Sequence, residues 1–342
     1  MHTRRHFLRQ TALAAAALQL QAFKWRPESA DGMVMTVAGP INPDAMHFTL
    51  THEHVLADFI GADNYSKTRY NPEEVYSVAL PFLTEVKKSG CSSFVDCSPA
   101  YLGRDVKLLK RLSESSGLNI ITNTGYYGAV GEKFLPRFVY HETQEQIASR
   151  WIKEWTDGIE DTNIKPGFIK TSVDKAPLSP TLRKIIDAAA ITHLATGLTI
   201  GVHTGDGKAA NEQLEILNAR GVAPEARIWI HAQNETDSSF HIAAAKKGSW
   251  VSFDGVNPKT IQDNVGFLKT MKTENLLARV LVSQDSGWYN VGDPKGGDYK
   301  NYTTIFTQLI PALQQNGFTK DEINALFIVN PARAFTVRVR KS

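Results

Sequence analysis

The sequence predicts an α/β protein built as a single (β/α)8 barrel, the TIM-barrel architecture. Three observations predict it. Short β-rich runs alternate with helical patterns eight times along the 342 residues. No long linker or shift in composition interrupts the chain past Gly32. Polar residues follow most of the strands, and barrels assemble their sites at the carboxyl ends of strands. The alternative is an open doubly wound sheet, which would concentrate its site at one crevice.

The elements follow one another in regular order. The predicted strands are Phe48–Val55, Cys91–Ser98, Asn119–Tyr127, Gly167–Val173, Thr199–Thr204, Arg227–Ala232, Trp250–Val256 and Arg279–Gln284. The predicted helices are Pro72–Ser89, Arg104–Ser116, Thr143–Ile159, Ser179–Ala195, Ala209–Asn218, Ser238–Lys247, Pro258–Met271 and Tyr302–Gln315. A small strand pair is expected near Met33–Val37 and a short helix at Lys320–Phe327, and Asn330 begins a last helix.

The sequence pattern of the first 22 residues predicts a secretory signal peptide of the twin-arginine type. Arg4 and Arg5 precede Phe7-Leu8, and the apolar run Thr11–Leu18 ends close to a small residue, Ala22. Such a run is too short to span a bilayer. We therefore expect the twin-arginine export machinery as a partner, an exported periplasmic protein without a membrane anchor, and a barrel domain over residues 33–338. The alternative is a retained amphipathic helix.

Composition and charge narrow the functional classes. The chain is 42% hydrophobic and 21% charged, as ordinary globular proteins are. Without the three arginines of the leader, the 38 basic residues become 35, equal to the 35 acidic residues. This balance argues against nucleic acid or an anionic membrane as a partner. Cys91 and Cys97 lie in one predicted strand, roughly 20 Å apart at about 3.3 Å per residue, so we expect buried thiols without a disulfide.

The first strand ends in His52-Glu53-His54. Successive side chains of a strand point to opposite faces, so His52 and His54 share the face of Phe48 and Leu50. Their Cα atoms lie about 7 Å apart, two steps of roughly 3.3 Å, and both rings can reach one cation. The alternative is that one histidine caps the strand and the other bonds a neighbour.

Four more strands end in residues that bind or bridge metals. Lys170, His203, His231 and Asp285 end the fourth, fifth, sixth and eighth strands. Each has a simpler explanation alone: a polar strand cap for a histidine, a helix N-cap for the aspartate, and a solvent-reaching amine for the lysine. Because all six residues fall on one rim, together they indicate a metal centre.

Four imidazoles and one carboxylate suit Zn²⁺ and related divalent ions. One tetrahedral ion would leave ligands over, so two ions about 3.5–4 Å apart fit better. Such a pair needs an anionic bridge. The Lys170 amine supplies it if burial and nearby cations remove its proton and it captures carbon dioxide as a carbamate, giving N6-carboxylysine. The second bridge would be hydroxide.

Several stretches together resemble the phosphotriesterase family of the amidohydrolase superfamily, from about Thr36 to Phe335. They are Thr49-Leu50-Thr51-His52-Glu53-His54, Gly103-Arg104-Asp105-Val106, Thr124-Gly125-Tyr126-Tyr127, Gly167-Phe168-Ile169-Lys170, Val202-His203-Thr204, Ile230-His231, Asp285-Ser286-Gly287 and Asn330-Pro331-Ala332. The resemblance implies that His52, His54 and Asp285 hold the more buried metal. It also implies that His203 and His231 hold the exposed metal, that carboxylated Lys170 bridges both, and that Asp285 accepts the proton as the bridging hydroxide attacks.

The chain departs from the family near the substrate. Gly255 stands where lactonase-like and organophosphate-hydrolysing members carry Arg or His, and Asn234 stands where the organophosphate enzymes carry a relay Asp, for which Glu235 is a candidate substitute. Tyr127 matches an aromatic position of the leaving-group pocket, with barrel-wall packing as the alternative. Trp288 and Tyr289 are candidates for an aromatic wall over the site or for a cover of the barrel end.

The expected function is that of a binuclear zinc-dependent hydrolase acting on an ester, lactone, amide or phosphoester bond of a small molecule. A neutral or weakly charged substrate is favoured, since the sequence offers no Arg cluster to clamp a phosphate monoester. A mononuclear amidohydrolase or deaminase and a non-catalytic exported ligand-binding barrel are the alternatives. A homodimer is a candidate assembly.

Overall fold

The structure, a computed structural model, describes residues 32–342. The signal peptide predicted for residues 1–22 lies outside this part of the chain. Within residues 32–342, no helix is both long and apolar enough to cross a membrane.

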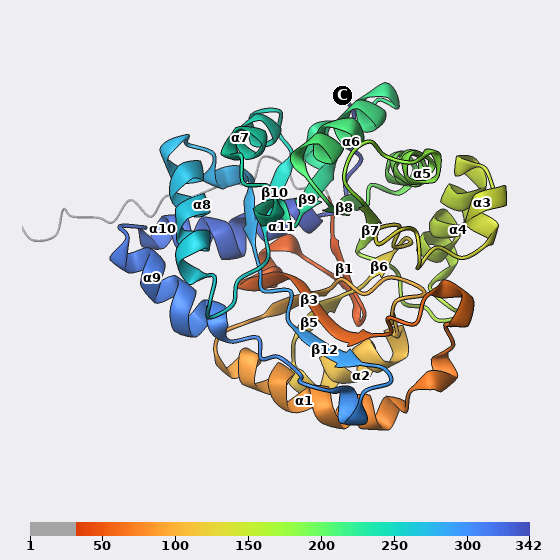
Figure 1. The fold of residues 1–342 in the computed structure, drawn as a ribbon. Coiled ribbons are helices and arrows are strands. Elements are labelled where there is room, and N and C mark those ends of the chain that lie inside the picture. Colours follow the sequence, from red (N-terminus) through yellow and green to blue (C-terminus); the bar gives the residue numbers. More distant parts are fainter. Residues whose placement is uncertain (1–31) are drawn as a thin grey trace, which may run out of the picture. The chain divides into compact units, whose positions relative to one another are not determined.

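Parallel strands occupy the centre of the fold (Figure 1). They are β3 (Thr49–Ala57), β4 (Ser93–Asp96), β5 (Asn119–Ile121), β6 (Asn123–Thr124), β7 (Phe168–Val173), β8 (Thr199–Thr204), β9 (Arg227–Ile230), β10 (Trp250–Phe253) and β11 (Val280–Val282). Each pairs in parallel with its neighbour in chain order, in a sheet from β6 to β11 and a sheet from β3 to β5. This order differs from that of an open doubly wound sheet, where the order reverses at a switch point.

The two sheets meet at both of their edges. Only Thr122 separates β5 from β6, so these two runs occupy one strand position. On the other side, the Asp285 amide donates to the His52 carbonyl at 3.0 Å, and the His52 amide donates to the Ser283 hydroxyl at 2.9 Å. The prediction of a (β/α)8 barrel is confirmed.

Helices surround the strands (Figure 1). They are α1 (Pro72–Lys88), α2 (Val106–Ser116), α3 (Phe138–His141), α4 (Gln144–Asp157), α5 (Pro180–Thr196), α6 (Gly207–Ala219), α7 (Ser238–Lys246), α8 (Ile261–Thr273), α9 (Ile310–Gln315), α10 (Lys320–Asn324) and α11 (Asn330–Phe335). Short 3-10 turns lie at Pro43–Met46, Ala62–Asn64, Lys67–Arg69, Pro224–Ala226, Ala232–Asn234, Leu277–Arg279 and Pro294–Gly296, and π-helical turns at Ile305–Leu309 and Ala325–Val329. Side-chain caps fix the helix starts, as where Thr143 and Gln146 form a reciprocal capping box.

The barrel interior is apolar at the end opposite the site. Phe168, Ile228 and Leu281 pack there with Phe335 from α11. The antiparallel pair β1 (Val34–Thr36) and β2 (Gly39–Ile41) lies beside this end, where the Val37 amide donates to the Ile120 carbonyl at 2.8 Å. Cys91 and Cys97 are buried free thiols, as predicted.

Several elements differ from the sequence prediction. The strand pair expected near Met33–Val37 extends to Ile41, and α3 falls where no element was predicted. The predicted strand Asn119–Tyr127 is interrupted at Thr122 and ends before Tyr127. The predicted loop after Asp285 contains a strand, β12 (Gly287–Asn290), parallel to β3. β12 pairs with the last residues of the nine-residue β3, from His54 to Ala57, on the edge opposite β4, where β3 has backbone groups free to accept a partner.

A substitution at Gly125 tests how closely the strands pack behind Lys170. A Cβ at Gly125 would lie 2.1 Å from the Lys170 carbonyl oxygen, and its φ of +120° disfavours any side chain. We expect Gly125→Ala to lower the free energy of unfolding by at least ~3 kcal/mol through clash and strain, measured by urea denaturation. The matched control is Gly266→Ala in α8, where a Cβ meets no atom within 4 Å; it should stabilise by ~0.5–1 kcal/mol. Equal effects of the two changes would contradict this packing.

Candidate metal centre

Three side chains from two strand ends converge at the mouth of the barrel. His52 and His54 project from β3, and Asp285 follows β11. The His52 Nε2 atom lies 3.2 Å from His54 Nε2 and 3.6 Å from Asp285 Oδ1, and His54 Nε2 lies 3.2 Å from the same oxygen. Both imidazoles are buried.

The outer partners of the two rings determine which nitrogen carries the proton. His52 Nδ1–H donates to Asp254 Oδ2 at 3.0 Å. The Ser98 hydroxyl donates its only proton to the Leu56 carbonyl at 2.6 Å, so it accepts from His54 Nδ1–H at 2.8 Å. Both Nε2 atoms are therefore unprotonated when the rings are neutral, and two nitrogen lone pairs and a carboxylate oxygen face one another.

This arrangement fits a metal ion. Acceptors at such distances repel one another unless a cation lies among them, and Asp285 Oδ1 is a buried oxygen without a hydrogen-bond donor. A tetrahedral zinc ion with ligands at ~2.0–2.1 Å separates its donor atoms by roughly 3.3–3.4 Å. The observed separations of 3.2–3.6 Å match that value. Burial lowers the pKa of His54 to about 4, which keeps its ring neutral and able to bind a metal at physiological pH.

Asp254 lies directly after β10 and connects His52 to His231 by hydrogen bonds. Its carboxylate accepts from His52 on one oxygen and from His231 Nδ1–H on the other, at 2.6 Å. The Gln233 amide and the Ser252 hydroxyl also donate to it, at 3.0 and 2.9 Å. Burial alone would raise the pKa of the Asp254 carboxyl, but the His231 and His52 rings outweigh burial and hold that pKa well below its usual range. His52, His231 and Asp254 form a second group of potential ligands.

Lys170 and His203 complete the rim. His203 makes an edge contact with His231 at a centroid distance of 4.4 Å, and its Nδ1 lies 3.0 Å from the Tyr127 hydroxyl. Lys170 is 1% exposed, and its Nζ lies 5.4 Å from the centroid of the Tyr127 ring. Within residues 32–342 this amine has no ion pair with a carboxylate. Burial lowers the pKa of Lys170.

The structure brings all six predicted ligands to one cavity of about 340 Å³. Tyr127 and Trp288 also line it, and Trp288 stacks on His54 at a centroid distance of 3.8 Å. Tyr289 does not line this cavity: its side chain is buried and its hydroxyl donates to Glu74 of α1 at 2.8 Å. The expectation for Tyr289 is corrected, because Trp288 and Tyr289 are successive residues of β12 and face opposite sides.

Sequence reasoning missed the partners of the imidazoles. Asp254 directly follows its strand, as His231 follows its own, so the rule that found the ligands could have found it. Gln233 has no such signal. A Cβ at Gly255 would lie 2.7 Å from Gln233 Nε2, so the glycine makes room for the amide that holds Asp254. Glu235, the candidate relay, instead accepts from the Gly207 and Asp237 amides.

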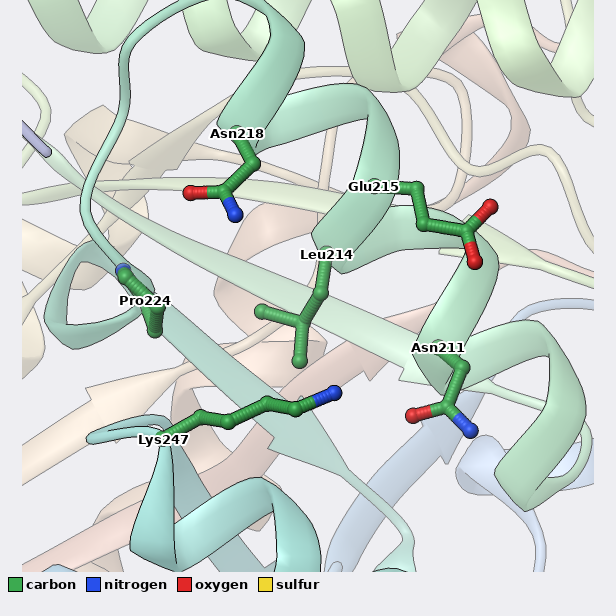
Figure 2. A pocket seen from close by; sticks show the side chains of 6 residues that line it. All are labelled: Asn211, Leu214, Glu215, Asn218, Pro224 and Lys247. Atoms are coloured by element: carbon green, nitrogen blue, oxygen red, sulfur yellow. The ribbon is translucent and has the colours of Figure 1, made fainter.

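A second hollow, of about 370 Å³, lies on the outer wall of the barrel. Figure 2 shows it between α6, which carries Asn211, Leu214, Glu215 and Asn218, and Lys247 at the end of α7. Its lining lacks histidine and cysteine, and Glu215 is its only carboxylate, so it offers no comparable set of metal ligands.

Comparison with known proteins identifies the family. Residues 32–335 match the phosphotriesterase family. The chain belongs to the phosphotriesterase family. The family resemblance inferred from the ligand order is thereby confirmed, and membership of this family together with the His and Asp groups supports a metal-dependent hydrolase.

Relatives in the family carry several names. The phosphotriesterase homology protein of Escherichia coli is 25% identical over 296 residues, 85% of this chain and 99% of the relative. An aryldialkylphosphatase of Saccharolobus solfataricus is 28% identical, covering 84% of this chain and 95% of the relative. An N-acetyltaurine hydrolase of Xenopus tropicalis is 25% identical, covering 91% and 99%.

Asp254→Asn tests the link between the two groups. An amide oxygen can accept from one imidazole only weakly and its NH₂ end cannot accept from the other, so at least one ring loses its orientation. We expect zinc affinity to fall by ~10–100-fold, measured by competition with a chromogenic chelator. Asp263→Asn, at an exposed position in the first turn of α8, is the control and should keep full affinity. Unchanged affinity in Asp254→Asn would contradict the role of this carboxylate.

Proposed function

We propose that this protein is a binuclear zinc-dependent hydrolase that cleaves an ester, lactone, amide or phosphoester bond. The observation that carries the proposal is the convergence of unprotonated His52 Nε2, His54 Nε2 and the Asp285 carboxylate beside the buried, unpaired amine of Lys170. His52, His54 and Asp285 would hold the more buried ion. His203 and His231 would hold the exposed one.

Lys170 would connect the two ions as N6-carboxylysine. A buried ammonium without a carboxylate is unfavourable, and burial lowers the pKa of this amine, so the neutral form with a free electron pair becomes accessible. That electron pair forms a bond to the carbon of carbon dioxide, one C=O pair moves to oxygen, and the nitrogen releases a proton to solvent. The product carries one negative charge over two oxygens, which suits a position among imidazoles and cations.

When bound, the two zinc ions would supply a nucleophile from water near neutral pH and would polarise the scissile carbonyl or phosphoryl group. Asp285 would accept the proton released in the attack and pass it on. Burial would raise the pKa of the Asp285 carboxyl, but the neighbouring His52 and His54 rings outweigh burial and hold that pKa below its usual range, so the proton would stay on this carboxylate only briefly. The Tyr127 hydroxyl orients His203, and Trp288 covers His54.

The substrate would be neutral or carry little charge. No arginine lines the cavity, so a phosphate dianion lacks its usual partner. The relatives include an aryldialkylphosphatase, whose name indicates phosphoryl chemistry, and an N-acetyltaurine hydrolase, whose name indicates acyl chemistry. Carboxyl-type esters or lactones are our preferred class for this chain. Asn234 stands where the organophosphate-hydrolysing members carry their relay Asp, so this chain lacks that side-chain function.

We further propose that the protein is exported to the periplasm by the twin-arginine route. Arg4-Arg5 followed by Phe7-Leu8 and an alanine-rich run support the proposal. This route carries folded proteins, which would allow the metals to be loaded before export.

Lys170→Met and Asp285→Asn test the proposed centre. Protein produced with zinc and bicarbonate should hold two ions per chain by elemental analysis, and Lys170→Met should hold fewer. We expect Asp285→Asn to lower kcat by at least ~10²-fold on the best member of a panel of lactones, aryl esters, acyl amides and phosphotriesters. One ion per wild-type chain would favour a mononuclear enzyme. Ligand binding without turnover, unaffected by Asp285→Asn, would favour a binding protein.

A double Arg4→Lys, Arg5→Lys change tests export. Because the receptor reads the guanidinium pair, we expect the double variant to stay in the cytoplasmic fraction, while wild type reaches the periplasm with its first residues removed. Fractionation with immunoblotting and sequencing of the mature N-terminus give the readout. Arg9→Lys is the matched control and should be exported normally. Equal export of all three proteins would exclude the twin-arginine route.

A further inference from the structure

The outer part of the metal-site cavity is apolar. Phe59, Val130, Phe134 and Trp288 line it above the histidines. The Phe59 ring stacks on Trp288 at a centroid distance of 5.6 Å and meets the edge of Phe134 at 6.4 Å. Phe59 is 45% and Val130 60% exposed, which is unusual for large apolar side chains that form one continuous surface. The cavity mouth therefore offers an apolar contact for a part of the substrate that does not react.

One cation stands in this apolar mouth. Lys133 lines the cavity, and its Nζ lies 5.4 Å from the centroid of the Phe134 ring. Within residues 32–342 it has no ion pair with a carboxylate. The nearby Glu132 accepts from Ser179, and Asp174 accepts from backbone amides, so both acids face other donors. Apart from Lys133, the charged residues of the lining are Lys170 and Asp285 of the metal centre.

The loop that carries Lys133 is held in a strained conformation. Val130, Gly131 and Glu132 all have positive φ, at 61°, 63° and 63°. For a β-branched residue such as Val130 this conformation is strained and persists only where the surroundings impose it.

Contacts from neighbouring segments impose this conformation. Asp174 accepts from the Val130 and Gly131 amides at 2.8 and 3.0 Å, and the Lys133 carbonyl accepts from the Ala62 amide at 3.0 Å. The loop is thus built to hold Val130 and Lys133 at the mouth.

We propose that Lys133 and the apolar mouth form a subsite for an amphiphilic substrate, with an apolar body and a single negative charge at the end remote from the scissile bond. The inference rests on the proposed hydrolase function and deepens it. One exposed lysine matches one anionic group such as a carboxylate or sulfonate. The apolar body would span the distance between the metal centre and the amine.

A matched pair of substrates tests the subsite. 4-Nitrophenyl hexanoate and the mono-4-nitrophenyl ester of adipic acid have acyl chains of equal length, but the second carries a terminal carboxylate. We expect Lys133→Met to lower kcat/KM for the adipate ester by ~5-fold, the upper end for an exposed ion pair, through KM, with little effect on the hexanoate ester. Lys133→Arg should retain the preference, and Lys133→Glu should reverse it. Because the pair is exposed, the preference should shrink as salt rises. Lys259→Met, exposed on the loop after β10 and outside the cavity lining, is the control and should behave as wild type.

A binding measurement separates failure of the subsite from failure of the hydrolase proposal. Calorimetric titration of the intact protein with 1-hexanesulfonate should show affinity that Lys133→Met weakens by a similar factor. Binding that depends on Lys133 in a metal-loaded protein that hydrolyses neither ester and no member of the lactone, amide and phosphotriester panel would overturn the hydrolase function and support the subsite. Equal losses on both esters, or sulfonate binding insensitive to Lys133→Met, would overturn the subsite while leaving the hydrolase intact.

Discussion

The arrangement of the candidate metal ligands at the barrel mouth depends on the hydrogen bonds that the Asp254 carboxylate accepts. This carboxylate accepts the Nδ1 protons of His52 from β3 and His231 from β9, and so fixes two rings from different parts of the barrel. Because each Nδ1 is protonated, each Nε2 presents its electron pair to the cavity. A buried carboxylate needs several donors to stay ionised, and Gln233, Ser252 and the His231 backbone amide also donate to it. These hydrogen bonds therefore orient the imidazoles of the rim.

Most of this rim could be predicted from the sequence, because parallel strands end at one edge of the barrel, and polar residues on these strands or just after them meet there. That rule places His52, His54, Lys170, His203, His231 and Asp285 correctly on the rim, and it applies equally to Asp254. It fails where tertiary pairing decides orientation. Trp288 and Tyr289 look equivalent in the sequence, but the pairing of β12 with β3 turns the first toward the cavity and the second toward α1.

Backbone strain at the site was beyond sequence prediction. His231 and Asp285 have φ of 61° and 53°, a region that few residues other than glycine adopt. At Asp285 the backbone amide is held by the His52 carbonyl, and the next amide, that of Ser286, donates to the buried Glu53 at 2.8 Å. These contacts come from β3, more than 200 residues away, so local propensity carries no trace of them. The strain aims the carboxylate at the two imidazoles.

In this barrel, the strands position the candidate metal ligands, whereas a loop shapes the part of the cavity that would select the substrate. The ligands lie on the paired strands of the barrel or in the turns that follow them, so their positions resist change. The mouth depends on the 128–135 loop, whose conformation is held by Asp174 and Ser172 from the end of β7. Because β7 also carries Lys170, one strand positions the proposed bridge on its inner face and the substrate-facing loop beyond its end. A change in that loop could therefore alter which substrate enters while the rim that would bind the metals keeps its geometry.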